Sequence, residues 1–312
     1  MHKRLLNEAI LEVAIQPQGP ILIKAGEKGA DPTLPDMEFV RTNGQPYLPG
    51  SSLKGAIRSH CERLARTVGG EAMACDPLHD RYSCGARLQR ERLRPEVVHT
   101  RSCFACRLFG NTALASRFSL SDAMPLDSTA LQTEERNGVA IDRVFGSVAV
   151  GPFNYETVTA GTFRATLVVR NFGLAQLGLL ALTFRDLQQG RVRLGFGKSR
   201  GLGTVTFTVQ PVLLRYPTCE LTPEGLRLLG ASQVTDTQAV PGIGMFPDTS
   251  GYDCAPNDTV PLPDGVTYTA NSWGEPELHL QDEAHITAFW RACVGLWREE
   301  VTRWPQRQSQ DS

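Results

Sequence analysis

The sequence predicts an α+β fold from three neighbouring segments. FRATLVVRN at 163–171 and GTVTFTVQPVLL at 203–214 are rich in β-branched and apolar residues, which is typical of strands. Between them, GLAQLGLLALTFRDLQ at 173–188 repeats leucine at helical spacing. Strand, helix and strand this close in sequence indicate an α+β arrangement.

The first fifty residues contain short extended segments separated by turns. NEAILEVAI at 7–15 and PILIK at 20–24 are apolar runs that predict two short strands or one bent strand. The next segment, 25–36, is rich in Gly, Pro and Asp, which predicts a loop. The pair Asn43-Gly44 then predicts a tight hairpin, because its turn needs residues that tolerate positive φ.

A helix is predicted from Ser51 to about Val68. Ser51 or Ser52 can cap its first turn, and two consecutive glycines end it. Lys54 and Arg58 lie one turn apart on one face, which is either a solvated basic face or a ligand contact. The apolar positions form a separate buried stripe of Leu53, Ile57, Cys61, Leu64 and Val68.

Residues 71–117 lack clean periodicity and hold four of the eight cysteines, with the spacing Cys75-x8-Cys84-x18-Cys103-x2-Cys106. A Cys-x2-Cys pair can reach one zinc ion from a single turn, and two further thiolates complete a tetrahedron. We therefore expect a structural zinc in this insertion. Four unrelated buried cysteines are the alternative, and a histidine could replace one ligand, the candidates being His60, His79 and His99.

Charge is distributed unevenly along the chain. Residues 213–312 have six Arg, no Lys and 14 acidic residues, a net charge of -8, which leaves +7 on residues 1–212. A basic body suits a polyanionic ligand, although segregated surface charge is an equal alternative. No apolar run approaches the ~20 residues of a membrane span, and no cleavage site follows the N-terminus, so we expect a cytoplasmic protein.

Two further segments carry candidate chemistry. GFGKSRGLG at 195–203 combines four glycines with Lys198 and Arg200, so its backbone can approach a phosphate closely. A Walker loop is excluded by the spacing. In the loop 25–36, Asp31 and Asp36 could bind Mg²⁺ or orient a 2′-hydroxyl attack on RNA, but aspartate beside proline is also ordinary turn chemistry.

The second half of the chain adds a hairpin and an extension. Residues 134–160 alternate apolar positions around Gly-containing turns, which predicts a long hairpin. Beyond Leu214 the sequence is rich in Pro, Gly and Asp and predicts loops. A final amphipathic helix is expected from His285 onward.

Three of these motifs, in this order, resemble one family. PYLPGSSLKGAIRS at 46–59, CxxCxLFG at 103–110 and the glycine-rich 195–203 are similar to the RAMP superfamily, specifically to backbone subunits of type III CRISPR effector complexes. The resemblance covers roughly residues 7–214. It implies a ferredoxin-like, RRM-type core in residues 1–214, with a zinc-binding insertion at 71–117 and a thumb hairpin at 134–160. Residues 215–312 form an acidic C-terminal extension that resembles nothing we can name.

The resemblance also implies roles for particular residues. The guide RNA (crRNA) would be held by Ser51, Ser52, Lys54 and Arg58, with Lys198 and Arg200 supporting the same face. In target-cleaving relatives an aspartate precedes the PGSSLKG motif, and that position falls on Asp36, with Asp31 as second choice. The expected activity is Mg²⁺-dependent cleavage of bound target RNA, beside other effector subunits and further copies of this chain.

Two alternatives to a target-cleaving subunit remain open. The first is a catalytically inactive, structural crRNA-binding subunit in which Asp36 is a turn residue. The second is a stand-alone RNase. That enzyme would need a His or Tyr acid/base pair near the binding face, and the sequence offers no convincing one.

Overall fold

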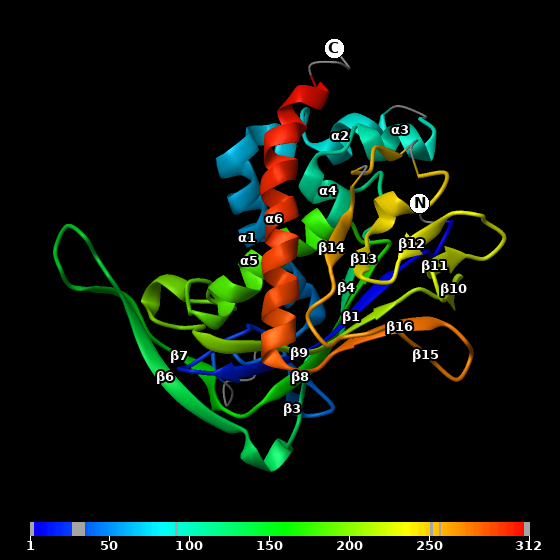
Figure 1. The fold of residues 1–312 in the computed structure, drawn as a ribbon. Helices are drawn as coiled ribbons and strands as arrows, with labels where there is room; N and C mark the ends of the chain where they lie inside the picture. Colours follow the sequence, from blue (N-terminus) through cyan, green and yellow to red (C-terminus); the bar gives the residue numbers. More distant parts are fainter. Residues whose placement is uncertain (1–2, 27–34, 91–92, 250–251, 256, 309–312) are drawn as a thin grey trace.

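The computed structural model describes residues 3–26, 35–90, 93–249, 252–255 and 257–308 (Figure 1). Its main sheet has the strand order β15-β16-β9-β1-β8-β4, and every neighbouring pair is antiparallel, with β5 pairing to β8 off this path. The strands are β1 (Glu8–Pro17), β4 (Phe118–Leu120), β5 (Met124–Pro125), β8 (Phe163–Arg170), β9 (Val205–Arg215), β15 (Thr269–Ala270) and β16 (Pro276–Leu280).

The centre of this sheet follows the order strand, helix, strand, strand, helix, strand along the chain. Helix α1 (Gly50–Met73) follows β1, and helix α5 (Leu174–Gln188) lies between β8 and β9. Both helices lie on one face of the sheet (Figure 1). Alternate residues of β1, from Ala9 to Ile15, are buried, as a half-covered strand requires. The predicted α+β class and helix 173–188 are therefore confirmed.

Helix α1 begins differently from the expectation. Its N-cap residue is Pro49, and Asp122 Oδ1 accepts a hydrogen bond from Gly50 N at 2.7 Å. The predicted capping by Ser51 or Ser52 is therefore wrong, because a carboxylate 72 residues away satisfies the first amide and both serines lie within the first turn.

The end of helix α1 agrees better with the expectation. The helix breaks at Gly69 and Gly70, as predicted, and Gly70 has a φ of 59°. The predicted stripe is buried at Leu53, Ile57 and Cys61 and half-buried at Leu64, but Val68 is 51% exposed beside this break. Ala65, one turn after Cys61, is buried in its place.

A long hairpin projects from the body of the molecule (Figure 1). Strands β6 (Gln132–Ile141) and β7 (Val148–Ala160) pair antiparallel, which confirms the long hairpin predicted at 134–160. Its tip exposes apolar side chains, with Val144 and Phe145 more than four-fifths exposed. A second, tight hairpin joins β2 (Arg41–Thr42) to β3 (Gln45–Pro46), and Asn43 and Gly44 have positive φ, as predicted.

The cysteine lobe, residues 71–117, contains three short helices where the sequence showed no periodicity. They are α2 (Cys84–Gln89), α3 (Pro95–Thr100) and α4 (Phe104–Phe109). Each has six residues, which is less than two turns and too short to display an amphipathic repeat.

Residues after β9 extend the core. Helix α6 (Glu283–Gln308) packs along α5, and β16 pairs with β9. The predicted loop character of residues 215–284 is wrong, since short strands form two small sheets there; strands of three or four residues leave no readable pattern. These strands are β10 (Cys219–Thr222), β11 (Gly225–Leu228), β12 (Val234–Asp236), β13 (Ala239–Pro241) and β14 (Thr259–Pro261).

The predicted final helix is present as α6 and begins two residues before His285. In the part of the chain that the structure describes, no helix combines the length and apolar composition that a bilayer span requires.

Candidate nucleic-acid interface and cysteine centre

Four buried cysteines meet in one place between α1 and the cysteine lobe. The sulfur atoms of Cys75, Cys84, Cys103 and Cys106 all lie within 4.8 Å of one another, and the Cys75 and Cys106 sulfurs are 3.7 Å apart. A tetrahedron with zinc–sulfur bonds of about 2.3 Å has sulfur–sulfur edges of about 3.8 Å. The donor set therefore fits a metal such as zinc, and the alternative of four unrelated cysteines is wrong.

Backbone amides hold these sulfurs in place. Cys106 N donates to Cys103 Sγ at 3.4 Å across the first turn of α4, and Cys103 N donates to Cys84 Sγ at 3.3 Å. Hydrogen bonds from the Cys103 and Cys106 thiols lower the pKa of Cys84 to about 7 and lower that of Cys75 further. Amides and thiols that stabilise thiolates favour metal binding, because the thiolate is the ligand.

The candidate histidines have other contacts. His60 Nε2 pairs with Asp186 Oδ2 at 2.8 Å, and His79 Nδ1 accepts from the amides of Arg81 and Tyr82 at 3.2 Å. His99 is buried with its ring 5.5 Å from that of Tyr252. Among the described residues, the four cysteines are the only group of three or more potential ligands close enough to share an ion.

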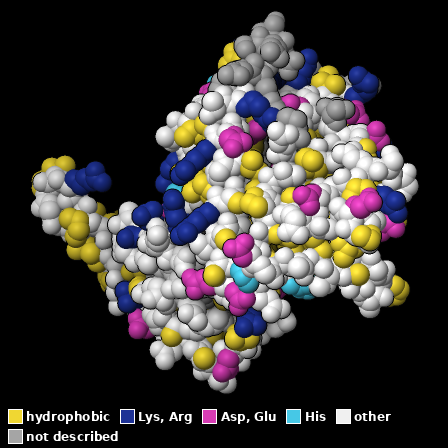
Figure 2. Space-filling view, in the orientation of Figure 1, with side chains coloured by type: hydrophobic (Ala, Val, Ile, Leu, Met, Phe, Trp, Pro, Cys, Tyr) yellow, Lys and Arg dark blue, Asp and Glu magenta, His cyan; other side chains and the backbone are white. Residues whose placement is uncertain are grey.

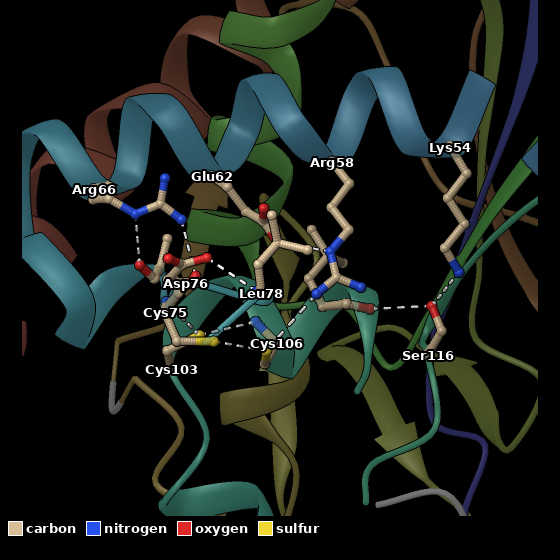
Figure 3. A network of polar contacts seen from close by, with 12 residues as sticks. Lys54, Arg58, Glu62, Arg66, Cys75, Asp76, Leu78, Cys103, Cys106 and Ser116 are labelled. Atoms are coloured by element: carbon tan, nitrogen blue, oxygen red, sulfur yellow. Dashed lines mark hydrogen bonds and ion pairs between the residues drawn. The ribbon is translucent and has the colours of Figure 1, made fainter. Parts of the chain in front are cut away.

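The predicted basic face of α1 points at the cysteine lobe (Figure 3). Lys54 Nζ donates to Ser116 Oγ at 2.8 Å and to Phe118 O at 2.9 Å. Burial, and after it the charge of Arg58, lowers the pKa of Lys54. Lys54 is therefore half-buried and bonded within the protein, rather than fully solvated.

Arg58 and Arg66 continue this face toward the cysteines (Figure 3). Arg58 Nε pairs with Glu62 Oε1 at 2.6 Å, and its Nη2 lies 3.9 Å from Cys106 Sγ. Arg66 donates to the carbonyls of Ala74 and Cys75 at 3.0 and 2.9 Å. These arginines attach the lobe to α1, a role that the sequence did not reveal.

A cleft remains open beside this face. It has a volume of about 450 Å³ and is lined by polar groups that include Arg58, His79, Gln89 and Asn111. Ser51 and Ser52 lie at the exposed start of α1, where the helix offers backbone amides and the positive end of its dipole.

The glycine-rich loop is held tightly and exposes its cations. Gly195 has a φ of 77°, and a Cβ added there would lie 2.2 Å from Leu22 O, so only glycine fits. Lys198 and Arg200 are exposed on the 3-10 turn Lys198–Arg200, and the Arg200 guanidinium lies 5.3 Å from the Phe196 ring. Among the four cations predicted to bind RNA, Lys198 and Arg200 are exposed to solvent, whereas Lys54 and Arg58 are half-buried.

Asp36 is exposed and bonded to the hairpin. Asp36 N donates to Asn154 Oδ1, and Asn154 N donates to Asp36 Oδ2, both at 2.9 Å. Asn154 Nδ2 in turn donates to Glu135 Oε1 at 2.6 Å. Sequence reasoning missed Asn154 and Glu135, because nothing in the hairpin sequence indicates contact with a loop more than 90 residues earlier. Asp31 lies outside the described residues.

The connecting segment, residues 20–25, lies against three of the predicted elements. These elements are the glycine-rich loop, the β6–β7 hairpin near Val158, and the residues that follow Asp36. Three backbone hydrogen bonds make the connection: Phe196 N to Leu22 O at 2.7 Å, Ile21 N to Val158 O at 2.9 Å, and Ala25 N to Glu38 O at 2.9 Å.

The face of the sheet opposite the helices lacks a stacking platform. RRM domains stack bases on aromatic residues of their sheet. Here the aromatic residues of β4, β8 and β9 are Phe118, Phe163 and Phe207, and all three are buried, while β1 has none. Base stacking on these strands is therefore not available.

Comparison with known proteins places this antiparallel α+β chain in a family. The family model of the RAMP superfamily matches residues 15–206, more than half of the chain, and the chain belongs to that superfamily. The family includes CRISPR-associated proteins, which indicates a CRISPR-related role in binding RNA. No curated protein matches the chain. The match ends at the start of β9, so it does not include α6.

Proposed function

We propose that this chain is a crRNA-binding backbone subunit of a type III CRISPR RNA-targeting complex that also cleaves bound target RNA in a metal-dependent manner. Its partners are crRNA, target RNA, other effector subunits and further copies of itself. The strand order β9-β1-β8-β4 with two helices on one face supports a ferredoxin-like core. The projecting β6–β7 hairpin supports a thumb, and the four-cysteine cluster supports a structural zinc.

The observation that carries this proposal is the connecting segment. It gathers the exposed cations Lys198 and Arg200, the hairpin root and the loop of Asp36 onto one part of the molecule. Cations there would bind guide phosphates, and a carboxylate at the hairpin root would lie where the thumb meets a paired strand. Lys54 and Arg58 contribute from α1, with less free charge because Lys54 donates to Ser116 of the lobe and Arg58 pairs with Glu62.

Guide binding is tested by removing the two exposed cations. Lys198→Ala with Arg200→Ala removes up to two phosphate contacts, so the salt dependence of affinity should fall by about 1.4 in slope, at about 0.7 per contact for single strands. The measurement is a titration of crRNA at several salt concentrations. Arg227→Ala is the control, since Arg227 pairs with Glu220 on the small β10–β11 sheet. An unchanged slope in the double variant contradicts the assignment.

Asp36 is the residue that we assign to cleavage. A single carboxylate fits Mg²⁺ when RNA phosphates supply the other ligands, and the ion would neutralise charge on the phosphate that is attacked. Asp36 itself would hold that ion and orient the attacking group, with Asn154 fixing the carboxylate through its amide.

Three variants in the assembled complex separate a catalytic from a structural Asp36. Asp36→Asn keeps an oxygen that can accept from Asn154 N but loses the charge, whereas Asp36→Ala loses both. Asn154→Ala keeps the carboxylate and removes the acceptor for Asp36 N. With complementary RNA and Mg²⁺, we expect Asp36→Asn and Asp36→Ala to abolish cleavage and Asn154→Ala to retain most of it.

One observation favours the alternative of a structural, non-cleaving subunit. The reciprocal bonds between Asp36 and Asn154 are what a residue that only fastens a loop would make. In that case the complex binds guide tightly and leaves target intact. Cleavage that survives Asp36→Asn but not Asp36→Ala would assign Asp36 to positioning.

A further inference from the structure

A groove outside the residues discussed so far lies between α5, β9 and α6. Its volume is about 720 Å³, within the range of small-molecule and nucleotide pockets. The floor is apolar and includes Leu182, Ile286, Trp290 and Val294. Part of the lining, including Trp290 and Arg291, belongs to α6, which the family match does not include. The groove is therefore a feature of the C-terminal extension joined to the core.

Arginines line the rim of this groove. Arg185 comes from α5, and Arg291 and Arg298 come from α6 two turns apart; all three are exposed. Glu283 is the one acidic residue among the described lining residues. Figure 2 shows Lys and Arg side chains gathered beside α6 in this region. The groove thus has a positive rim in an extension whose net charge is strongly negative.

The two arginines from α6 differ from the other arginines of the extension. Arg215, Arg227 and Arg303 each form ion pairs with glutamates of the extension. Across the described residues, neither Arg291 nor Arg298 has an ion-pair partner. Arg185 pairs with Asp186 at 2.8 Å but remains 49% exposed. Exposed arginines beside apolar side chains are suited to an anionic ligand with a flat apolar part.

We propose that this groove binds a segment of single-stranded RNA, with phosphates at Arg185, Arg291 and Arg298 and a base against Trp290. Trp290 is half-buried, and its ring packs edge-on against Phe184 at 6.1 Å, which holds it in place. Aromatic rings and arginines together are the usual elements of sequence-tolerant single-strand binding.

The remaining lining residues favour RNA over an acidic peptide. Gln188, Gln189 and Gln210 carry side-chain amides, which both donate and accept hydrogen bonds as base edges do. An acidic peptide would also satisfy the arginines and could bond to these amides through its backbone, but an Asp- or Glu-rich segment offers no flat base to lie against Trp290. The groove would hold RNA that leaves the surface assigned under the proposed function, and it uses none of the same residues.

The test uses the full-length chain and a fluorescent ten-residue oligouridine. Arg291→Ala with Arg298→Ala should weaken binding about tenfold and lower the salt slope by about 1.4, the value for two single-strand contacts. Arg291→Lys with Arg298→Lys keeps the charge and should keep most of the slope. Both arginines are exposed, so neither change should unfold the protein, which thermal unfolding checks. Unchanged affinity in the alanine variant overturns the proposal.

Two further measurements distinguish this groove from the other RNA-binding surface. In a background of Lys198→Ala and Arg200→Ala, the effect of the groove variant should be unchanged, because independent sites act additively. Ultraviolet cross-links from oligouridine should fall on the segments around Trp290 and Gln188. Absence of cross-links on these two segments overturns the proposal. So does saturable binding of a Glu-rich peptide at this groove without binding of oligouridine, which would make it a protein-docking site.

Discussion

The cysteine lobe and the C-terminal extension are two additions to the same sheet and helices, and they are held in different ways. The lobe has three six-residue helices, and four cysteine sulfurs converge on one point within it. The extension places one 26-residue helix along α5, with Phe289, Cys293 and Trp297 buried, and adds β16 to the sheet. One addition is organised around four ligand atoms and the other around an apolar interface.

The difference follows from length. Helices of less than two turns are not stable on their own, so the lobe needs a cross-link that its apolar side chains cannot replace. A long helix can instead bury several large side chains, each contributing about 1.5–3 kcal/mol relative to exposure. We therefore expect the lobe to depend on a metal and the extension to depend on close packing.

The largest effect should come from a cysteine ligand. Cys106→Ser removes one of four donors, and structural zinc sites have apparent binding free energies on the order of 10 kcal/mol. We expect zinc to fall from about one equivalent to near zero and hydrogen exchange to rise in the lobe, with α6 little changed. Elemental analysis and exchange mass spectrometry measure both. Cys254→Ser, outside the cluster, is the control. Unsubstituted protein with less than half an equivalent of metal would contradict the site.

A smaller effect is expected at a close contact between α5 and α6. A Cβ at Gly178 would lie 2.2 Å from Cys293 O, so Gly178→Ala should force the helices apart and lower the free energy of unfolding by about 3 kcal/mol. Gly295→Ala on α6 is a matched control, because a Cβ there meets nothing within 4 Å and should raise stability by about 0.5–1 kcal/mol. Denaturant unfolding measures both. Equal effects would mean that the interface is loose, and zinc content should not change in either variant.

The smallest effect addresses whether the two additions are independent. They meet at Trp304, whose Nε1 donates to Ala72 O at 2.9 Å and whose ring lies 4.4 Å from the Arg107 guanidinium. Trp304→Phe removes that hydrogen bond and should cost about 1 kcal/mol. Because the bond links α6 to the lobe, zinc should also dissociate faster in the presence of a chelator. Trp273→Phe, at an 88% exposed position, should change neither quantity. A normal rate of zinc loss in Trp304→Phe would show that the additions are independent.

Several parts of the fold and site could be read from the sequence because they depend on neighbouring residues. Helix α1 with its break at Gly69-Gly70, the Asn43-Gly44 hairpin and helix α5 follow from local spacing and turn chemistry. The cysteine spacing was enough to predict that four thiols share one centre. The RAMP motifs were enough to predict the superfamily.

What the sequence could not reveal depends on residues far apart in the chain. Asp122 caps α1 from 72 residues away, and Lys54 and Arg58 turn toward a lobe whose position the local pattern does not specify. Asp36 meets Asn154 across 118 residues.

The sequence by itself thus determined helices α1, α5 and α6, the two hairpins, the four-thiol centre and the family, since each rests on the spacing of residues within a motif. Only the tertiary structure decided which cations are exposed to solvent and which bind the cysteine lobe to α1. The reason is that exposure depends on burial by, and hydrogen bonds to, segments far away in the sequence. The same holds for the arginine-rimmed groove, whose arginines come from helices about a hundred residues apart and meet only when α6 packs on α5.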